Sequence, residues 1–182
     1  LKEDPLPLLL NTIASIEINE ISSGLIIGII FVCILIFLSA LVSGSEVSFF
    51  SLTSSNLDDL SEIDEKKEKQ IRQILRDPNK LLATILIANN FINVAIIVLT
   101  SYLTSQIFYF DSSPVLKFVV QVILITFILV LLGEITPKVY AKQNAVNFSK
   151  KMISLIHFFE IIFSPLSSIL ISATSFIDKR LK

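Results

Sequence analysis

The apolar residues of this chain gather in long blocks separated by short polar stretches. Three blocks, at about residues 21–43, 80–107 and 114–134, are each long enough to cross the ~30 Å core of a bilayer as helices rising ~1.5 Å per residue. This pattern predicts an all-α membrane protein with three transmembrane helices. Between the first two blocks, residues 57–76 combine mixed charges with a broken apolar stripe, which is typical of an amphipathic cytoplasmic helix.

The segment after the third block has two interpretations. Residues 138–178 contain another apolar region, about 152–177, which is interrupted by His157, Glu160 and Pro165. Basic residues flank this region on both sides, which places both of its ends in the cytoplasm. We therefore expect two short juxtamembrane helices, broken near the proline, that lie at the inner membrane interface or dip into it. A fourth span is the alternative.

Composition narrows the class further. The chain has 182 residues, of which 53% are hydrophobic, and a mean hydropathy of +0.76, which excludes an ordinary soluble domain. Its formal net charge is −1, and no basic stripe with interleaved aromatics supports nucleic-acid binding. The single Cys33 cannot form an intrachain disulfide, and the single His157 has no Cys or His partners for a zinc site.

The distribution of charge predicts the orientation in the membrane. Lys and Arg concentrate in residues 57–76 and after residue 137, whereas the acidic leader, residues 1–20, and the turn at 108–113 hold almost none. Basic residues favour the cytoplasmic side. We therefore expect the N-terminus outside and the C-terminus in the cytoplasm of a multi-pass membrane protein.

Each predicted span carries a polar motif in the inner half of the membrane. The motifs are Ser43-Gly44-Ser45-Glu46, then Asn89, Asn90 and Asn93, and finally Gly133-Glu134-Ile135-Thr136-Pro137-Lys138. Each alone has a simple structural interpretation. The first fits a capping box that starts a new helix, the second fits hydrogen bonds between helices, and the third fits a helix end in headgroup water.

The agreement of the three motifs in depth favours a common site. A carboxylate at membrane depth costs ~2.5–3.5 kcal/mol on insertion scales, so Glu134 indicates function. Pro137 lacks an N–H and is expected to end its helix, which frees carbonyls of the preceding turn. With Ser43, Asn89 and Asn93, every candidate donor atom is an oxygen. Oxygen donors favour Mg²⁺ or Ca²⁺ over zinc or copper.

Glu46 leaves two possibilities open. Its carboxylate either adds a second negative charge to the predicted site or pairs with Lys138, and the sequence does not distinguish the two.

Together, the patterns S-G-S-E after the first span, N-N-x-x-N in the second and G-E-x-x-P-K after the third resemble the transmembrane (DUF21) domain of the CNNM/CorC magnesium transporters. The leader and the first motif also resemble the gliding-motility-associated bacteroidete branch of that family. The resemblance covers about residues 20–180. It implies a homodimer in the bacterial inner membrane that exports Mg²⁺ by alternating access from an inward-facing site, with Na⁺ influx as the proposed driving force.

The resemblance also implies a set of ligands and partners. Carried over by motif, the magnesium ligands are Ser43, Asn89, Asn93 and Glu134, while Ser45, Glu46 and Asn90 stand in matching motifs without an assigned role. Family members usually continue into a cytoplasmic CBS-domain pair that binds ATP, so we expect such domains in the full-length chain. Nucleotide regulation would reside in those domains.

Two other functions compete with cation transport. A non-transporting membrane scaffold or sensor module would tolerate substitution of the polar residues and would depend on the surfaces of residues 57–76 and 150–178. An intramembrane enzyme is not expected, because Ser43 and Ser45 have no evident base and His157 lies in a different context near the interface.

Overall fold

The computed structural model describes residues 17–18, 22–61, 64–109 and 114–181. These residues are helical apart from short connections and two strands, β1 (Glu17–Ile18) and β2 (Phe108–Tyr109), which pair antiparallel. The predicted all-α membrane class is confirmed. Most of the predicted acidic leader and most of the predicted turn after the second span lie outside the described residues.

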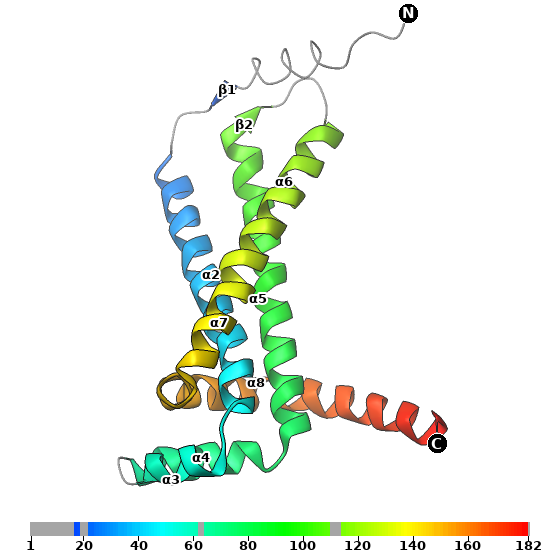
Figure 1. Cartoon of the computed structure of the whole chain (residues 1–182). Helices are drawn as coiled ribbons and strands as arrows, with labels where there is room; N and C mark the ends of the chain where they lie inside the picture. The colour runs from blue at the N-terminus through cyan, green and yellow to red at the C-terminus, as the bar shows by residue number, and fades with distance from the viewer. Residues whose placement is uncertain (1–16, 19–21, 62–63, 110–113, 182) are drawn as a thin grey trace, which may run out of the picture.

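Three helices start at the β1–β2 end of the molecule and run toward the opposite end, which only the two longer ones reach (Figure 1). They are α2 (Ser23–Phe50), α5 (Pro78–Ile107) and α6 (Pro114–Ile128). Ser22 caps α2, because its hydroxyl accepts a hydrogen bond from the backbone N–H of Leu25 at 3.3 Å. Large apolar side chains on all three helices are exposed, as expected for surfaces that face lipid.

The first predicted span ends too early. We expected a break or a new helix start at Ser43–Glu46, but α2 continues as one helix to Phe50. The hydroxyls in this stretch bond to carbonyls of their own helix: Ser45 Oγ donates to Leu41 O at 2.7 Å, and Ser48 Oγ donates to Ser45 O at 3.1 Å. These serines therefore need no helix end, and the capping-box interpretation is wrong.

The helix also does not end at Pro137, as the sequence predicted. α6 is followed by a π-helical segment, η1 (Leu129–Ile135), and then by α7 (Thr136–Gln143). The N–H of Thr136 donates to Leu131 O, five residues back, which is the hydrogen bond of a π turn. Pro137 therefore lies in the first turn of α7, where a proline is tolerated. Pro137 still withholds one N–H from the carbonyls of the preceding turn.

Residues 57–76 form two helices, not the single one predicted. These are α3 (Ser54–Ser61) and α4 (Glu65–Leu75), and they lie across the end of the bundle opposite β1 and β2 (Figure 1). Asp64 caps α4, because its carboxylate accepts from the N–H of Lys67 at 3.2 Å. In α4, the neighbouring ammonium of Lys69 lowers the pKa of the exposed Glu65 carboxyl.

After α7 the chain turns at Asn144 and forms α8 (Ala145–Leu181). The break expected at Ser164–Pro165 is absent, because Pro165 lies inside α8, on an exposed position of the helix. Figure 1 shows α8 crossing the long axis of the bundle near α3 and α4, with its second half extending beyond the other helices.

The exposed face of α8 changes character along its length. Asn147 and Lys151 are exposed in the first half, whereas apolar side chains are exposed on the same side in the second half: Phe158, Ile161, Ile162, Leu166 and Ile169. The opposite face is buried against the bundle through Ile153, Ile156 and Phe159.

Four helical stretches in the described part of the chain are long and apolar enough to cross a membrane, by length and composition alone: Ser23–Phe50, Pro78–Gln106, Gln121–Gln143 and Ala145–Ala173. This is one more than the three predicted spans. The fourth stretch belongs to α8, which crosses the axis of the other three (Figure 1).

Candidate functional site

Oxygen atoms from three elements meet inside the bundle. The hydroxyl of Ser39 on α2 lies 3.0 Å from Asn89 Oδ1 and 2.8 Å from Asn93 Oδ1, both on α5. The Asn93 amide donates to Glu134 Oε1 in η1 at 3.4 Å. Ser39 is fully buried, and both asparagines and the glutamate are half-buried. We call these four side chains the oxygen cluster.

Local structure places each member of the oxygen cluster. Asn89 and Asn93 are four residues apart on a continuous helix, so both amides face α2. Glu134 lies in the π turn. The preceding residue, Gly133, allows close approach of α2: a Cβ there would lie 3.3 Å from Ser39 Oγ. The glycine is therefore part of the geometry that lets Ser39 reach the asparagines.

The oxygen cluster has more hydrogen-bond acceptors than donor hydrogens. A serine hydroxyl has a single hydrogen, yet two amide oxygens face Ser39 Oγ at hydrogen-bonding distance. Together with the Glu134 carboxylate, these oxygens form a set of hard ligands, most of them neutral and one anionic. Mg²⁺ and Ca²⁺ prefer ligands of this kind. In the described residues, no group of three or more His, Cys, Asp or Glu side chains gathers, so any cation site here depends on neutral oxygens.

Ser43 lies one turn beyond Ser39 on the same face of α2. It is 1% exposed, and its hydroxyl has no hydrogen-bond partner in the protein. A buried hydroxyl without a partner is costly, and it indicates that a water molecule or an ion belongs beside it. The structure thus places the predicted ligand Ser43 next to the oxygen cluster without bonding it to the other members.

Sequence reasoning missed Ser39. It lies four residues before Ser43 and is the only hydroxyl-bearing residue between Gly24 and Val42. That spacing places both serines on one helix face, which is the signal that could have identified it.

The remaining predicted site residues lie apart from the oxygen cluster. Asn90 is exposed and donates to Leu86 O at 2.9 Å, and Ser45 donates to its own helix. Glu46 forms an ion pair with Lys138, with Oε2 and Nζ 2.8 Å apart. The structure therefore decides the question left open by the sequence, because Glu46 pairs with the lysine of the third motif.

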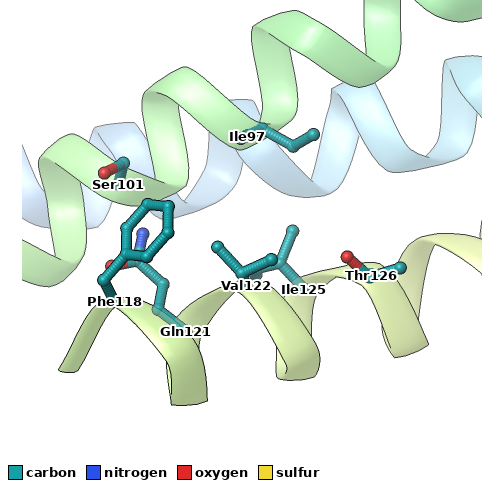
Figure 2. Close-up of a pocket in the computed structure, with 7 residues that line it drawn as sticks. All are labelled: Ile97, Ser101, Phe118, Gln121, Val122, Ile125 and Thr126. Carbon is teal, nitrogen blue, oxygen red and sulfur yellow. The ribbon is translucent and has the colours of Figure 1, made fainter. Parts of the chain in front are cut away.

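A separate pocket of about 330 Å³ opens between α5 and α6, nearer the β1–β2 end. Figure 2 shows its lining of apolar side chains and three uncharged polar ones: Ile97, Phe118, Val122 and Ile125, with Ser101, Gln121 and Thr126. None of these lining residues is charged. This pocket lacks the carboxylate that distinguishes the oxygen cluster, so the cluster is the stronger candidate for a cation site.

Comparison with known proteins agrees with this architecture. The sequence model of the cyclin M transmembrane N-terminal domain (CNNM) matches residues 29–182, which includes every member of the oxygen cluster. The chain is 32% identical over 121 residues to a UPF0053 protein of Haemophilus influenzae, covering 66% of this chain and 27% of that protein. It is 27% identical over 104 residues to the UPF0053 inner membrane protein YfjD of Escherichia coli, covering 57% of this chain and 23% of that protein. The chain thus spans about a quarter of the length of these relatives.

Proposed function

Because the chain belongs to the CNNM family of membrane domains, we propose that it moves a divalent cation, Mg²⁺, across the membrane. The observation that carries this proposal is the oxygen cluster, formed by Ser39, Asn89, Asn93 and Glu134. The hydroxyl of Ser43, which has no hydrogen-bond partner in the described part of the protein, would add the oxygen of a fifth side chain. Oxygens from α2, α5 and η1 would bind the ion as cargo, with bound water completing the octahedron that Mg²⁺ requires.

The donor set also fits a transported ion better than a permanently bound one. A single carboxylate among neutral oxygens gives a site of modest charge, and fewer charged ligands bind a dication less tightly. A transporter must release its cargo at every cycle, so modest affinity is an advantage. We propose export by alternating access coupled to Na⁺ influx, as the family resemblance implies.

The proposal includes a membrane topology. We propose that α2, α5 and the continuous α6–η1–α7 rod are the three spans and that α8 lies at the cytoplasmic interface. Two observations support this: α8 crosses the bundle axis (Figure 1), and its second half exposes apolar side chains while its first half exposes Asn147 and Lys151. The basic residues of α4 then lie inside the cell and the N-terminus outside.

The proposed partners come from the family resemblance. We propose a homodimer in the bacterial inner membrane, with cytoplasmic CBS-pair domains following α8 in the full-length protein. The exposed apolar faces of α2, α5 and α6 are available to a second copy of the chain, which would cover part of them in place of lipid.

The test is Mg²⁺ binding to the purified protein in lipid nanodiscs, measured by calorimetry and by thermal unfolding. Glu134→Gln keeps the size of the side chain but removes the charge, so we expect it to weaken Mg²⁺ binding at least tenfold. Asn90→Ala is the matched control, because the Asn90 side chain is exposed and bonds only to its own helix; it should bind as the wild type does. Stabilisation by Mg²⁺ that persists in Glu134→Gln would favour the scaffold or sensor function instead.

A further inference from the structure

An ion pair lies directly beyond the oxygen cluster, on the side of the α3–α4 end of the molecule. Glu46 Oε2 on α2 and Lys138 Nζ on α7 are 2.8 Å apart. The two side chains are 35% and 37% exposed, so the pair sits at the border between the packed bundle and water. Beyond it lies the end of the molecule that carries α3 and α4.

The pair continues the two faces that form the oxygen cluster. On α2, Glu46 follows Ser39 and Ser43 on one helix face, ~10 Å and ~4.5 Å further along the axis. On the facing element, Lys138 follows Glu134 by four residues, about one turn. The two elements touch between these levels, because a Cβ on Gly44 would lie 3.3 Å from the carbonyl oxygen of Pro137.

Charge at this position acts on a cation in the cluster. Glu134 and Glu46 together carry two negative charges, and the Lys138 ammonium cancels one of them. Electrostatic interactions over a distance of roughly 10 Å are appreciable at the edge of a low-dielectric interior, and salt screens them in part when the side chains are as exposed as these. The ion pair lies at the α2–α7 contact between the oxygen cluster and the α3–α4 end of the molecule, so a cation leaving the cluster toward that end would pass near it.

We propose that Glu46 and Lys138 form a charge gate on the cytoplasmic side of the site, in which Lys138 is a tethered cation that competes with the transported dication. This inference rests on the proposed function. In the empty site the ammonium neutralises Glu46. When a dication occupies the oxygen cluster, the positive charge of Lys138 lowers the affinity and promotes release, and the negative charge of Glu46 does the opposite.

A charge gate and a purely structural ion pair make different predictions. If the pair only held α2 to α7, neutralising either partner would break the same contact and change Mg²⁺ affinity in the same direction. A charge gate predicts opposite directions. Lys138→Gln leaves an unbalanced negative charge and should tighten Mg²⁺ binding about tenfold, whereas Glu46→Gln leaves an unbalanced positive charge and should weaken it by a similar factor.

The experiment is a calorimetric Mg²⁺ titration of the full chain in nanodiscs at low and high NaCl. The double variant Glu46→Gln/Lys138→Gln is neutral at this position and should bind within threefold of the wild type, as should the charge swap Glu46→Lys/Lys138→Glu. Lys142→Gln is the matched control, because Lys142 lies one turn further along α7 and is exposed; it should change the affinity less than twofold. High salt should reduce all the single-variant effects.

Each outcome decides the matter. Opposite shifts in the two single variants, cancelled in the double variant, support the gate. If the Mg²⁺ affinity of both single variants shifts in the same direction or does not shift, the gate is overturned. The proposed function still stands in that case, provided that the wild type binds Mg²⁺ and Glu134→Gln does not. Absence of Mg²⁺ binding in the wild type would overturn both. If one single variant fails to fold, the other single variant, compared with the neutral double variant, still tests whether the net charge of the pair controls affinity.

Discussion

Gly133→Ala isolates the geometry of the oxygen cluster from its chemistry, because it removes no ligand. The added Cβ would lie 3.3 Å from Ser39 Oγ and 3.8 Å from Ser39 Cβ, so the serine must move by a few tenths of an ångström. Ser39 is fully buried and in contact with Asn89 and Asn93, which leaves it little room to move without disturbing them. Mg²⁺ demands ligand distances of about 2.0–2.1 Å in near-ideal octahedral geometry, so such a displacement should cost affinity.

The expected effect on folding is small by comparison. Alanine is favoured over glycine in a helix by ~1 kcal/mol, and crowding at a packed site costs ~1–3 kcal/mol. These terms largely oppose each other, so we expect the free energy of unfolding without Mg²⁺ to change by no more than ~2 kcal/mol. Binding, in contrast, should weaken about tenfold, which corresponds to ~1.4 kcal/mol.

Thermal or chemical unfolding with and without Mg²⁺ measures both quantities in one assay. At a free concentration of ~100 times the wild-type Kd, Mg²⁺ should stabilise the wild type by about 2.7 kcal/mol and Gly133→Ala by only about 1.4 kcal/mol. Gly24→Ala is the control, since a Cβ there meets nothing closer than Ser22 Oγ at 3.9 Å. Equal Mg²⁺ stabilisation of Gly133→Ala and the wild type would refute the inference that Ser39 must approach η1 this closely to bind the ion.

Two further predictions concern packing around the site. Gly44→Ala would place a Cβ 2.8 Å from the Phe148 ring and 3.3 Å from Pro137 O, so it should destabilise the fold by ~1–3 kcal/mol in denaturant unfolding. Phe148→Leu should partly rescue this loss. Stability equal to that of the wild type would contradict the contact. Thr84→Val removes the 3.1 Å hydrogen bond between the buried hydroxyls of Thr84 on α5 and Ser167 on α8 and strands the serine, so it should cost ~1–3 kcal/mol. The double variant Thr84→Val/Ser167→Ala should recover part of that loss, and an equal or larger loss in the double variant would argue against a shared bond.

The sequence predicts the membrane class well because the signal is long and cumulative. A stretch of about twenty predominantly apolar residues has few alternatives, and α5 begins within two residues of the predicted start of the second span. Helix breaks were predicted less well, because each rests on one or two residues. Pro137 and Pro165 were both expected to end helices, yet a π turn accommodates the first and the second lies on an exposed position of α8.

The sequence predicted three of the four members of the oxygen cluster but not how they assemble. The second and third motifs supplied Asn89, Asn93 and Glu134, and the structure brings them together. Ser39 was missed, because one serine in an apolar span is usually a neutral packing residue and only its spacing from Ser43 distinguishes it. The pairing of Glu46 with Lys138 depends on the separation of α2 and α7, which Gly44 and Phe148 determine and which no local pattern encodes.

The continuity of the helices bears on how the site can open. Ser39, Ser43 and Glu46 belong to one unbroken helix, so they move together with α2. Their counterparts on the facing side, Gly133 and Lys138, are joined by the π turn and the first turn of α7. A shift of α2 against this rod would therefore change the approach of Ser39 to Gly133 and the Glu46–Lys138 ion pair at the same time. Because the backbone hydrogen bonds of α2 need not break, such a shift costs less than unwinding a helix within the membrane, where each unsatisfied backbone group costs several kcal/mol. Rigid-body motion of α2 is thus a less costly way than helix unwinding to couple the oxygen cluster to the Glu46–Lys138 ion pair.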